Sequence, residues 1–328
     1  MNVHILPIDP LDRVTGSCDL VHIPDLDLRV LVDCGAYVDS GRPDSLDDQP
    51  FPFDPSSIHC VLLTHAHLDH CGRLPKLVAE GFKGQVIATE ETRETAKIVL
   101  EDATRLTRRR EQERAVAAIR WRTPEHNLFV RPLSLATDVF ASAHRSAHIL
   151  GSVSWELIVG PKETPAEQLH ILFSGDVGSN RPGCVVQSLL GRAMHPSTTV
   201  DLAFVESTYG GTRRTPQELD ARRRRDALRE QVAAGLGRGG PVILPVFAVQ
   251  RAQDLLWDLH VLLAEQADVF GRAPILVDAP MALRFQKVLS EGLTRTFISP
   301  NDKVRHAWLG KHAVADLGAA RPVPGNER

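Results

Sequence analysis

The chain has 328 residues, of which 43% are hydrophobic and 24% are charged, and its formal net charge is −3. This composition is typical of a globular protein long enough for two domains, and it excludes an intrinsically disordered chain. The nearly balanced charge argues against a whole-surface nucleic-acid or membrane binder, so any site for a polyanion has to be local.

The sequence carries no signal for export or membrane insertion. Residues 1–17 lack the charged and apolar regions of a signal peptide, and no apolar run approaches the length that spans a bilayer. The five cysteines are scattered and form no C-x-x-C pair, so neither a disulfide framework nor a structural zinc knuckle is predicted. We therefore expect a soluble, cytoplasmic protein without membrane contacts.

Short apolar runs dominate the first part of the chain, which we assign to one domain over residues 1–205. Runs of strand length and composition predict early strands at residues 2–8, 19–23, 29–35 and 60–64. A segment that mixes charged and apolar residues at helical spacing predicts a helix over residues 87–120. Further strands are predicted at residues 127–133, 138–143, 155–159, 169–175 and 201–207.

The pattern changes near residue 206, where predicted helices and strands begin to alternate. Helices are predicted at residues 215–236, 252–266 and 282–293, and strands at residues 241–246 and 274–280. Such alternation is typical of an α/β domain with a parallel sheet. We therefore expect a second domain over residues 206–328.

A cluster of metal-type side chains follows the predicted strand at 60–64, in the stretch His65-Ala-His67-Leu-Asp69-His70. Side chains in a strand repeat every two residues, so His65 and His67 point the same way if the extended conformation continues. Three imidazoles and a carboxylate that converge at a strand end are costly to desolvate without a partner. A divalent cation accepts all four, so we predict a metal site here rather than loop or core histidines.

Three more candidate ligands stand at or near the ends of predicted strands. Asp33 ends the apolar run of residues 30–32, His148 precedes a Gly-Ser turn, and Asp176 lies between two glycines. Taken singly, an aspartate at a strand end is more often a turn former. The order of these residues around the histidine cluster is what favours a shared site.

Six motifs together resemble the metallo-β-lactamase fold and, within it, the β-CASP branch, which includes RNA-processing nucleases and the mRNA 3′-end cleavage subunit. They are VTGSC, LVDCG, LTHAHLDHCGRLPKL, SAHILGS, FSGDVG and VESTYGG, and the resemblance covers roughly residues 11–282. It implies an α/β fold in which an αββα sandwich is followed by a Rossmann-like β-CASP insertion domain. That insertion is expected to be incomplete here.

The resemblance also implies a centre with two Zn²⁺ ions. The expected ligands of the first zinc are His65, His67 and His148. Those of the second zinc are Asp69 and His70, and Asp176 is expected to bind both ions. Three carboxylates are expected to serve catalysis: Asp33 as a group that orients ligands, Asp69, and Glu206 as the acid of the VESTYGG motif.

The activity implied by the resemblance is zinc-dependent hydrolysis of RNA phosphodiester bonds, with single-stranded RNA as the substrate and hydroxide as the nucleophile. Whether the protein forms a homo-oligomer is left open. Two alternatives also remain open. One is another metallo-β-lactamase-fold hydrolase, such as a thioesterase or lactonase, although those lack the VESTYGG step into an insertion. The other is a non-catalytic or decayed β-CASP homologue.

The chain departs from the family pattern in several places. Gln250 and Ala147 stand where glycine is usual, and the Asp-Arg-x-His continuation after STYGG is absent. No segment resembling H-S-G-H follows the second domain, and we interpret His306 and His312 as surface residues. We therefore expect a chain truncated at its C-terminus, with a weakened second zinc site and poor catalysis.

Arginine clusters are the only candidate contacts for a polyanion outside the metal site. They lie at Arg108–Arg110, Arg213–Arg214 and Arg222–Arg225. Without interleaved aromatic residues, most are expected to be solvated helix faces, and Arg213–Arg214 is the best candidate because it follows the VESTYGG motif.

Overall fold

The computed structural model describes residues 1–8, 15–37, 46–107, 110–124, 133–178, 199–215, 217–218, 220–265, 275–296 and 320–322. These residues belong to two compact units. The first consists of Met1–Gly178 with Ala193–Gly210, and the second is mainly Gly211–Arg328. The assignment of two domains to residues 1–205 and 206–328 stays a prediction.

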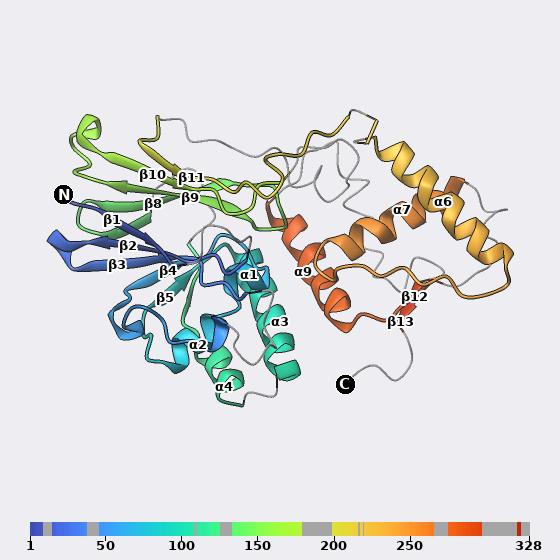
Figure 1. Ribbon diagram of the computed structural model, residues 1–328, viewed down its shortest axis with the longest axis horizontal. Coiled ribbons are helices and arrows are strands. Elements are labelled where there is room, and N and C mark those ends of the chain that lie inside the picture. The colour runs from blue at the N-terminus through green and yellow to red at the C-terminus, as the bar shows by residue number, and fades with distance from the viewer. Residues whose placement is uncertain are drawn as a thin grey trace. The chain divides into compact units, whose positions relative to one another are not determined.

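The first unit contains a six-stranded sheet in the order β1-β2-β3-β4-β5-β6 (Figure 1). Its strands are β1 His4–Pro7, β2 Asp19–Ile23, β3 Leu28–Val32, β4 Cys60–Leu62, β5 Gln85–Ile87 and β6 Trp121–Arg122. The pairs β1–β2 and β2–β3 are antiparallel, whereas β3 to β6 run parallel. The carboxyl ends of β3 and β4 therefore meet at one edge, where Asp33 and the histidine motif follow.

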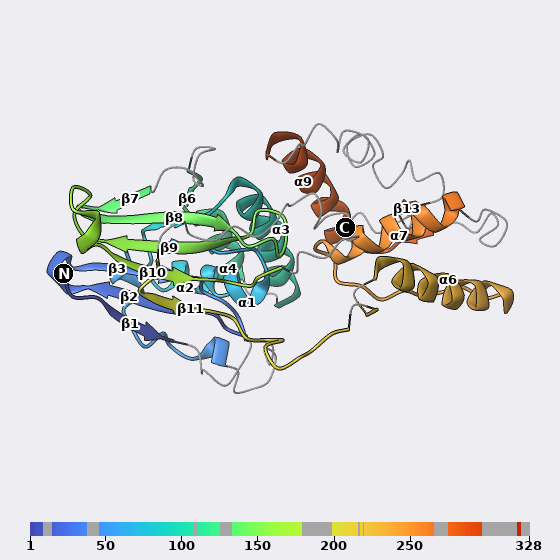
Figure 2. The ribbon, with the colours of Figure 1, turned by 90° about the horizontal axis from the view of Figure 1, so that it is seen from above.

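A second sheet of five strands has the order β11-β10-β9-β8-β7. Its strands are β7 Leu133–Ala136, β8 Val139–Arg145, β9 Val153–Val159, β10 Leu169–Phe173 and β11 Leu202–Phe204. Only the pair β10–β11 is parallel. Figure 2 shows the strands of this sheet overlying β1 to β3 of the six-stranded sheet.

One hydrophobic core fills the space between the two sheets. It takes Val30 and Leu62 from the first sheet and Trp155, Leu157 and Phe173 from the second, and all five are buried. Alternate residues of each strand face this core because the side-chain period of a strand is two. The sandwich therefore fixes the ends of strands from both sheets relative to one another.

Four helices of the first unit are α1 Leu68–Cys71, α2 Leu74–Ala79, α3 Glu90–Thr107 and α4 Arg110–Ala118. In Figure 1, α2, α3 and α4 lie on the side of the six-stranded sheet that faces away from the five-stranded sheet. The predicted single helix over 87–120 is wrong at its start. Ile87 belongs to β5, where it pairs with Leu62, so the helix begins at Glu90.

The second unit contains α6 Ala221–Gly237, α7 Arg251–Glu265 and α9 Pro280–Thr296, with a parallel pair of β12 Ile275–Val277 and β13 Ala320–Pro322. The strand predicted at 241–246 is wrong, because no strand lies there. Pro241 and Pro245 have no N–H to donate to a ladder, and Ile243 is 81% exposed. Helices α7 and α9 confirm the helical segments predicted for the rest of this region. The helix predicted at 215–236 is wrong at its start, because α6 begins at Ala221 after Asp220, whose side chain accepts the N–H of Arg222.

Short 3-10 helices occupy Pro24–Leu26, Leu46–Asp48, Pro55–Ser57 and Pro165–Glu167. Within the described ranges, every helix is too short or too polar to cross a lipid bilayer.

Candidate metal centre

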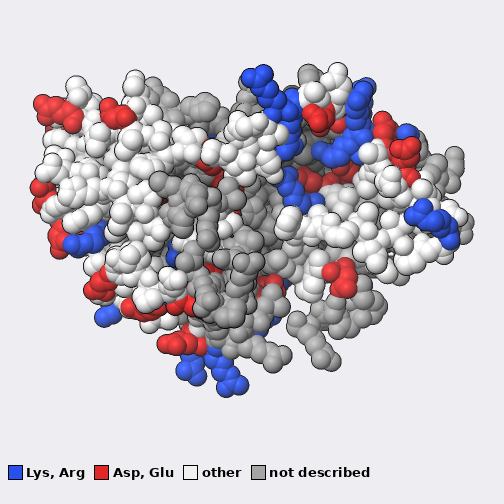
Figure 3. Space-filling view, viewed as in Figure 1, with Lys and Arg blue, Asp and Glu red and all other residues white. Residues whose placement is uncertain are grey.

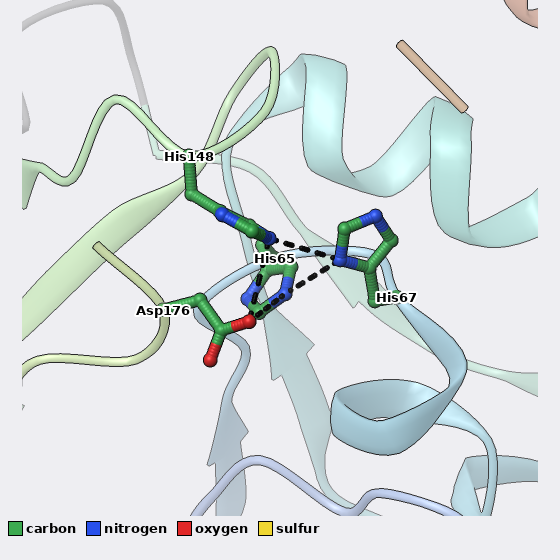
Figure 4. A group of neighbouring side chains, drawn as sticks. All are labelled: His65, His67, His148 and Asp176. Atoms are coloured by element: carbon green, nitrogen blue, oxygen red, sulfur yellow. Dashed lines mark hydrogen bonds and ion pairs between the residues drawn. The ribbon is translucent and has the colours of Figure 1, made fainter. Parts of the chain in front are cut away.

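Four side chains from three different segments converge near the ends of β4 and β10 (Figure 4). His65 follows β4, His67 immediately precedes α1, His148 follows β8 and Asp176 follows β10. One ligand atom from each of them lies within 4.8 Å of all the others. The sandwich therefore brings residues that are far apart in the sequence to one point.

The potential ligand atoms face one another directly. His67 Nδ1 lies 3.1 Å from His65 Nε2 and 3.1 Å from His148 Nε2. Asp176 Oδ2 lies 3.3 Å from His148 Nε2 and 3.8 Å from His65 Nε2. Three imidazole nitrogens and one carboxylate oxygen form a donor set that suits zinc, so these residues fit a divalent cation.

The predicted ligands of a second ion lie on the other side of Asp176. His70 Nε2 is 3.3 Å from Asp176 Oδ1 and 3.9 Å from Asp69 Oδ2. The two oxygens of Asp176 thus face different groups, Oδ2 the three histidines and Oδ1 His70. This is the placement that a carboxylate shared by two cations requires.

Asp33 contacts His70 and is almost fully buried, with 1% of its surface exposed. Its backbone is left-handed, with φ 61°, and its carboxylate accepts hydrogen bonds from Thr64 N–H at 2.7 Å and from Thr64 Oγ1 at 2.8 Å. His70 Nδ1 lies 2.7 Å from Asp33 Oδ2. Because an ionised carboxylate only accepts, His70 donates through Nδ1, which aims Nε2 at Asp176.

The local electrostatics favour the ligand forms of two of these groups. Burial lowers the pKa of His65 well below its usual value, and the neighbouring imidazoles of His70, His67 and His148 lower it further. Burial alone would raise the pKa of Asp176, but the hydrogen bond and charge of His70 outweigh it and lower the pKa to about 2. At neutral pH, His65 therefore offers a free lone pair and Asp176 is an anion.

Burial lowers the pKa of His70, but Asp33 and Asp176 outweigh burial, so the pKa of His70 is raised well above its usual value. Burial raises the pKa of Asp69. A cation that binds His70 through Nε2 therefore has to displace a proton from that nitrogen.

The loop that carries His148 is held by close packing and by a serine. Ser152 Oγ accepts hydrogen bonds from the backbone N–H of His148 at 3.0 Å and of Ile149 at 3.2 Å. Gly178 packs so tightly that a Cβ there would lie 1.6 Å from the carbonyl oxygen of Ala147. Ala147 itself has a φ of 54°, which explains why glycine would suit this position.

Glu206 holds the loop that follows Asp176. Its carboxylate accepts hydrogen bonds from the backbone N–H groups of Val177 and Thr208, both at 3.1 Å, and its own N–H donates to Ser174 Oγ at 3.0 Å. Glu206 is therefore linked to the backbone next to Asp176, beside the candidate centre.

Two residues that contribute to the site were absent from the sequence prediction, namely Thr64 and Ser152. Thr64 immediately precedes the histidine motif, and Ser152 follows the glycine of the SAHILGS motif, so short polar residues next to predicted ligands were the available signal. His306, His312, Arg108 and Arg109 lie outside the described residues.

The arginines of α6 largely face acids of their own unit. Arg224 Nε lies 2.7 Å from Asp258 Oδ2, Arg225 Nη1 lies 3.8 Å from Asp258 Oδ1, and Arg229 Nη2 lies 3.2 Å from Asp226 Oδ1. Figure 3 shows basic and acidic side chains interspersed at the right of the view. The sequence predicted a solvated helix face here, and the structure adds that these three arginines pair with acids of their own unit.

Comparison with known proteins places this chain in a family. The family described as the Metallo-beta-lactamase superfamily matches residues 17–157. Ribonuclease TTHA0252 of Thermus thermophilus is 34% identical over 319 residues, which cover 94% of this chain and 67% of the ribonuclease. The chain belongs to the β-CASP family of the metallo-β-lactamase superfamily.

Two other similar proteins have lower sequence identity. Transcription termination factor FttA of Methanothermobacter thermautotrophicus is 28% identical over 275 residues, 81% of this chain and 40% of the factor. Endoribonuclease ysh-1 of Neurospora crassa is 25% identical over 334 residues, 94% of this chain and 36% of the endoribonuclease. This β-CASP chain thus spans about two thirds of the bacterial ribonuclease and well under half of the other two relatives.

Proposed function

We propose that this chain forms the metal-binding part of a zinc-dependent hydrolase that cleaves phosphodiester bonds in single-stranded RNA in the cytoplasm. The observation that carries the proposal is the convergence of His65, His67, His148 and Asp176 on one point, with ligand atoms within 4.8 Å. The substrate class is drawn from the names of the similar ribonuclease and endoribonuclease.

The side chains divide into those that hold zinc and those that hold the ligands in place. We assign one ion to the three histidines with Asp176, and a second to Asp69 and His70 with the same Asp176. Bound zinc supplies Lewis acidity and lowers the pKa of water to near 7. Asp33 accepts the Nδ1–H of His70, which keeps the Nε2 of that ring directed at Asp176.

The carboxylate of Glu206 holds the loop that follows Asp176. By accepting the N–H of Val177, it fixes the backbone that follows Asp176, so the shared carboxylate keeps its orientation. Glu206 is half-buried beside the site, and this position also suits a role in proton transfer.

Metal analysis and hydrolysis assays test the proposal together. Protein purified without chelators is analysed for zinc and assayed on single-stranded RNA, on DNA of the same sequence, on a thioester and on a β-lactam. We expect bound zinc and slow RNA cleavage, with His67→Ala releasing most of the zinc and Asp176→Ala abolishing cleavage. Glu163→Ala, which removes an exposed carboxylate outside the site, is the matched control.

Absence of zinc from the unchelated protein would contradict the metal site. Turnover of the thioester or the β-lactam with intact RNA would instead favour one of the other hydrolases of this fold. Bound zinc without turnover of any of these substrates would favour a non-catalytic homologue.

A further inference from the structure

A buried arginine lies beside the candidate centre without reaching its ligands. Arg73 follows α1, three residues after His70, and is 6% exposed. Burying a guanidinium is costly unless its N–H groups are bonded. Its Nε donates to the carbonyl oxygen of Gly35, and its Nη2 donates to that of Gly16 at 3.2 Å.

Two aromatic rings pack against this guanidinium. Its central carbon lies 4.8 Å from the ring centroid of Tyr37 and 5.4 Å from that of Phe51. The Tyr37 ring also packs against Gly16, where a Cβ would lie 2.3 Å from a ring carbon. Arg73 is thus held both by two aromatic rings and by two carbonyls, which suits a guanidinium whose donors diverge in a rigid fork.

The two carbonyls bound by Arg73 belong to segments that form hydrogen bonds with Asp69 and His70 of α1. Ser17 N–H, next to Gly16, donates to the carbonyl oxygen of Asp69 at 2.9 Å. Cys34 N–H, next to Gly35, donates to the carbonyl oxygen of His70 at 2.8 Å. The guanidinium therefore connects, through one residue on each side, to the backbone of both predicted ligands of the second ion.

Gly35 contacts both the Ser17 segment and Asp69. Its N–H donates to the carbonyl oxygen of Ser17 at 2.8 Å, and a Cβ on Gly35 would lie 1.6 Å from the carbonyl oxygen of Asp69. Asp33, two residues earlier, meets His70 at 2.7 Å. A shift of the Gly35 segment would therefore change both the Asp33–His70 hydrogen bond and the position of Asp69.

We propose that Arg73 is a positioning residue that holds the Asp69–His70 half of the centre in register with Asp33. This inference rests on the proposed function, because it assumes that this half binds a cation. Among the described residues, the guanidinium of Arg73 bonds the carbonyls of Gly35 and Gly16 and packs against the rings of Tyr37 and Phe51. Loss of the guanidinium therefore weakens the second ion selectively and leaves the site of the three histidines nearly intact.

Titration with Co²⁺ tests this selectivity, because the visible absorption of cobalt reports the ligands of each ion as it binds. Metal-stripped wild type, Arg73→Met and Lys76→Met are compared. Lys76 is the matched control: it is 9% exposed, its Nζ lies 5.1 Å from the Phe51 centroid, and it donates to the carbonyl oxygens of Asp47 and Gln49 instead.

We expect Arg73→Met to weaken the second cobalt by about 10- to 100-fold, as is typical for partners of metal ligands, and to change the first by less than about twofold. Lys76→Met should leave both affinities unchanged. Equal weakening of both ions in Arg73→Met, or no weakening, would overturn the inference. Wild type that binds no cobalt at all would instead overturn the proposed function.

Arg73→Lys keeps the inference testable if Arg73→Met does not fold. A lysine retains the charge but presents a single ammonium in place of the fork, so it cannot hold both carbonyls in the same way. We expect a smaller, still selective loss of the second cobalt. Wild-type affinity for both ions in Arg73→Lys would count against the proposed geometry.

Discussion

The two units of the chain differ in how much of their structure is held by burial. In the first unit, strands of two sheets share one core, and Asp33 and His65 are almost completely buried with hydrogen-bond partners. In the described part of the second unit, hydrophobic clusters are small, and Phe247 is 84% exposed. The candidate ligands, whose atoms lie within 4.8 Å of one another, belong to the unit whose core fixes its strand ends.

The largest effect expected from this difference concerns the core of the first unit. Trp155 is fully buried between the sheets, and its Nε1 donates to the carbonyl oxygen of Leu63 at 3.0 Å. Trp155→Ala should lower the free energy of unfolding by about 3–5 kcal/mol, through lost burial and a residual cavity. Urea denaturation measures it.

The matched change in the second unit is Ile243→Ser, at a side chain that is 81% exposed. It should alter the free energy of unfolding by less than about 0.5 kcal/mol. Comparable losses in the two variants would mean that the units do not differ in this way.

Metal removal is expected to have the next largest effect and to act on the first unit alone. A ligand present at a thousand times its dissociation constant stabilises the folded state by about 4 kcal/mol. Chelation of zinc should therefore lower the melting temperature of the first unit and leave that of the second unchanged. Differential scanning calorimetry with and without chelator measures both transitions, and a shift in the second unit would refute the assignment of the ions.

Two glycines offer a smaller and more local comparison. Gly178 packs against the His148 loop, so the Cβ of Gly178→Ala should cost about 1–3 kcal/mol and lower zinc occupancy. A Cβ on Gly211, in the second unit, would have none of the described residues within 4 Å apart from its chain neighbours, and the φ of Gly211 is not left-handed. Gly211→Ala should leave stability within about 1 kcal/mol of wild type and zinc unchanged. Chemical denaturation and metal analysis of both variants test the contrast.

The smallest expected effect is a pH dependence of the first unit at a site away from the metal centre. Glu156, on β9, lies 2.6 Å from His144 Nε2 and 2.7 Å from His170 Nδ1. Burial raises the pKa of Glu156, but the hydrogen bonds from His144 and His170 outweigh it, so the pKa lies below its usual value of 4.5. The ionised carboxylate is thus favoured in the folded state.

Because the folded pKa of Glu156 is lower than the unfolded one, its contribution to stability is present above pH 4.5 and is lost as the pH falls through the folded pKa. Glu156→Gln should cost about 1 kcal/mol at pH 7, and the difference from wild type should shrink below pH 4.5. Urea denaturation at pH 7, 5.5 and 4 measures this, and a difference that does not change with pH would rule out the charge as its cause.

Local features of the sequence were enough to predict most strands of the first unit and the helices of the second. Apolar runs of strand length and charged helical patterns act over neighbouring residues, so they are visible in the chain itself. The predictions failed where the secondary structure depends on whether a neighbouring strand pairs with the segment. Residues 241–246 have strand composition but form no strand, and Ile87 joins β5 because β4 and β6 pair on either side of it.

At the candidate centre, too, the sequence predicted which residues take part but not the contacts between them. The histidine motif, Asp33, His148 and Asp176 were visible as metal-type residues at strand ends, and the structure places their side chains together. Their assignment to particular ions stays a prediction. Which atom faces which depends on contacts between distant segments, which the sequence does not display.

The sequence by itself determines which residue types stand near the ends of strands. Hydrogen bonds between distant segments form only when the two sheets pack together. The Asp33–His70 pair spans 37 positions, and the carbonyls bound by Arg73 lie 38 and 57 positions away from it. Gln250, which stands where the family usually has glycine, has a φ of 63° before α7, a backbone conformation that glycine adopts most readily. Burial fixes such contacts because a buried polar group without a partner is costly, and only the folded core determines which groups are buried.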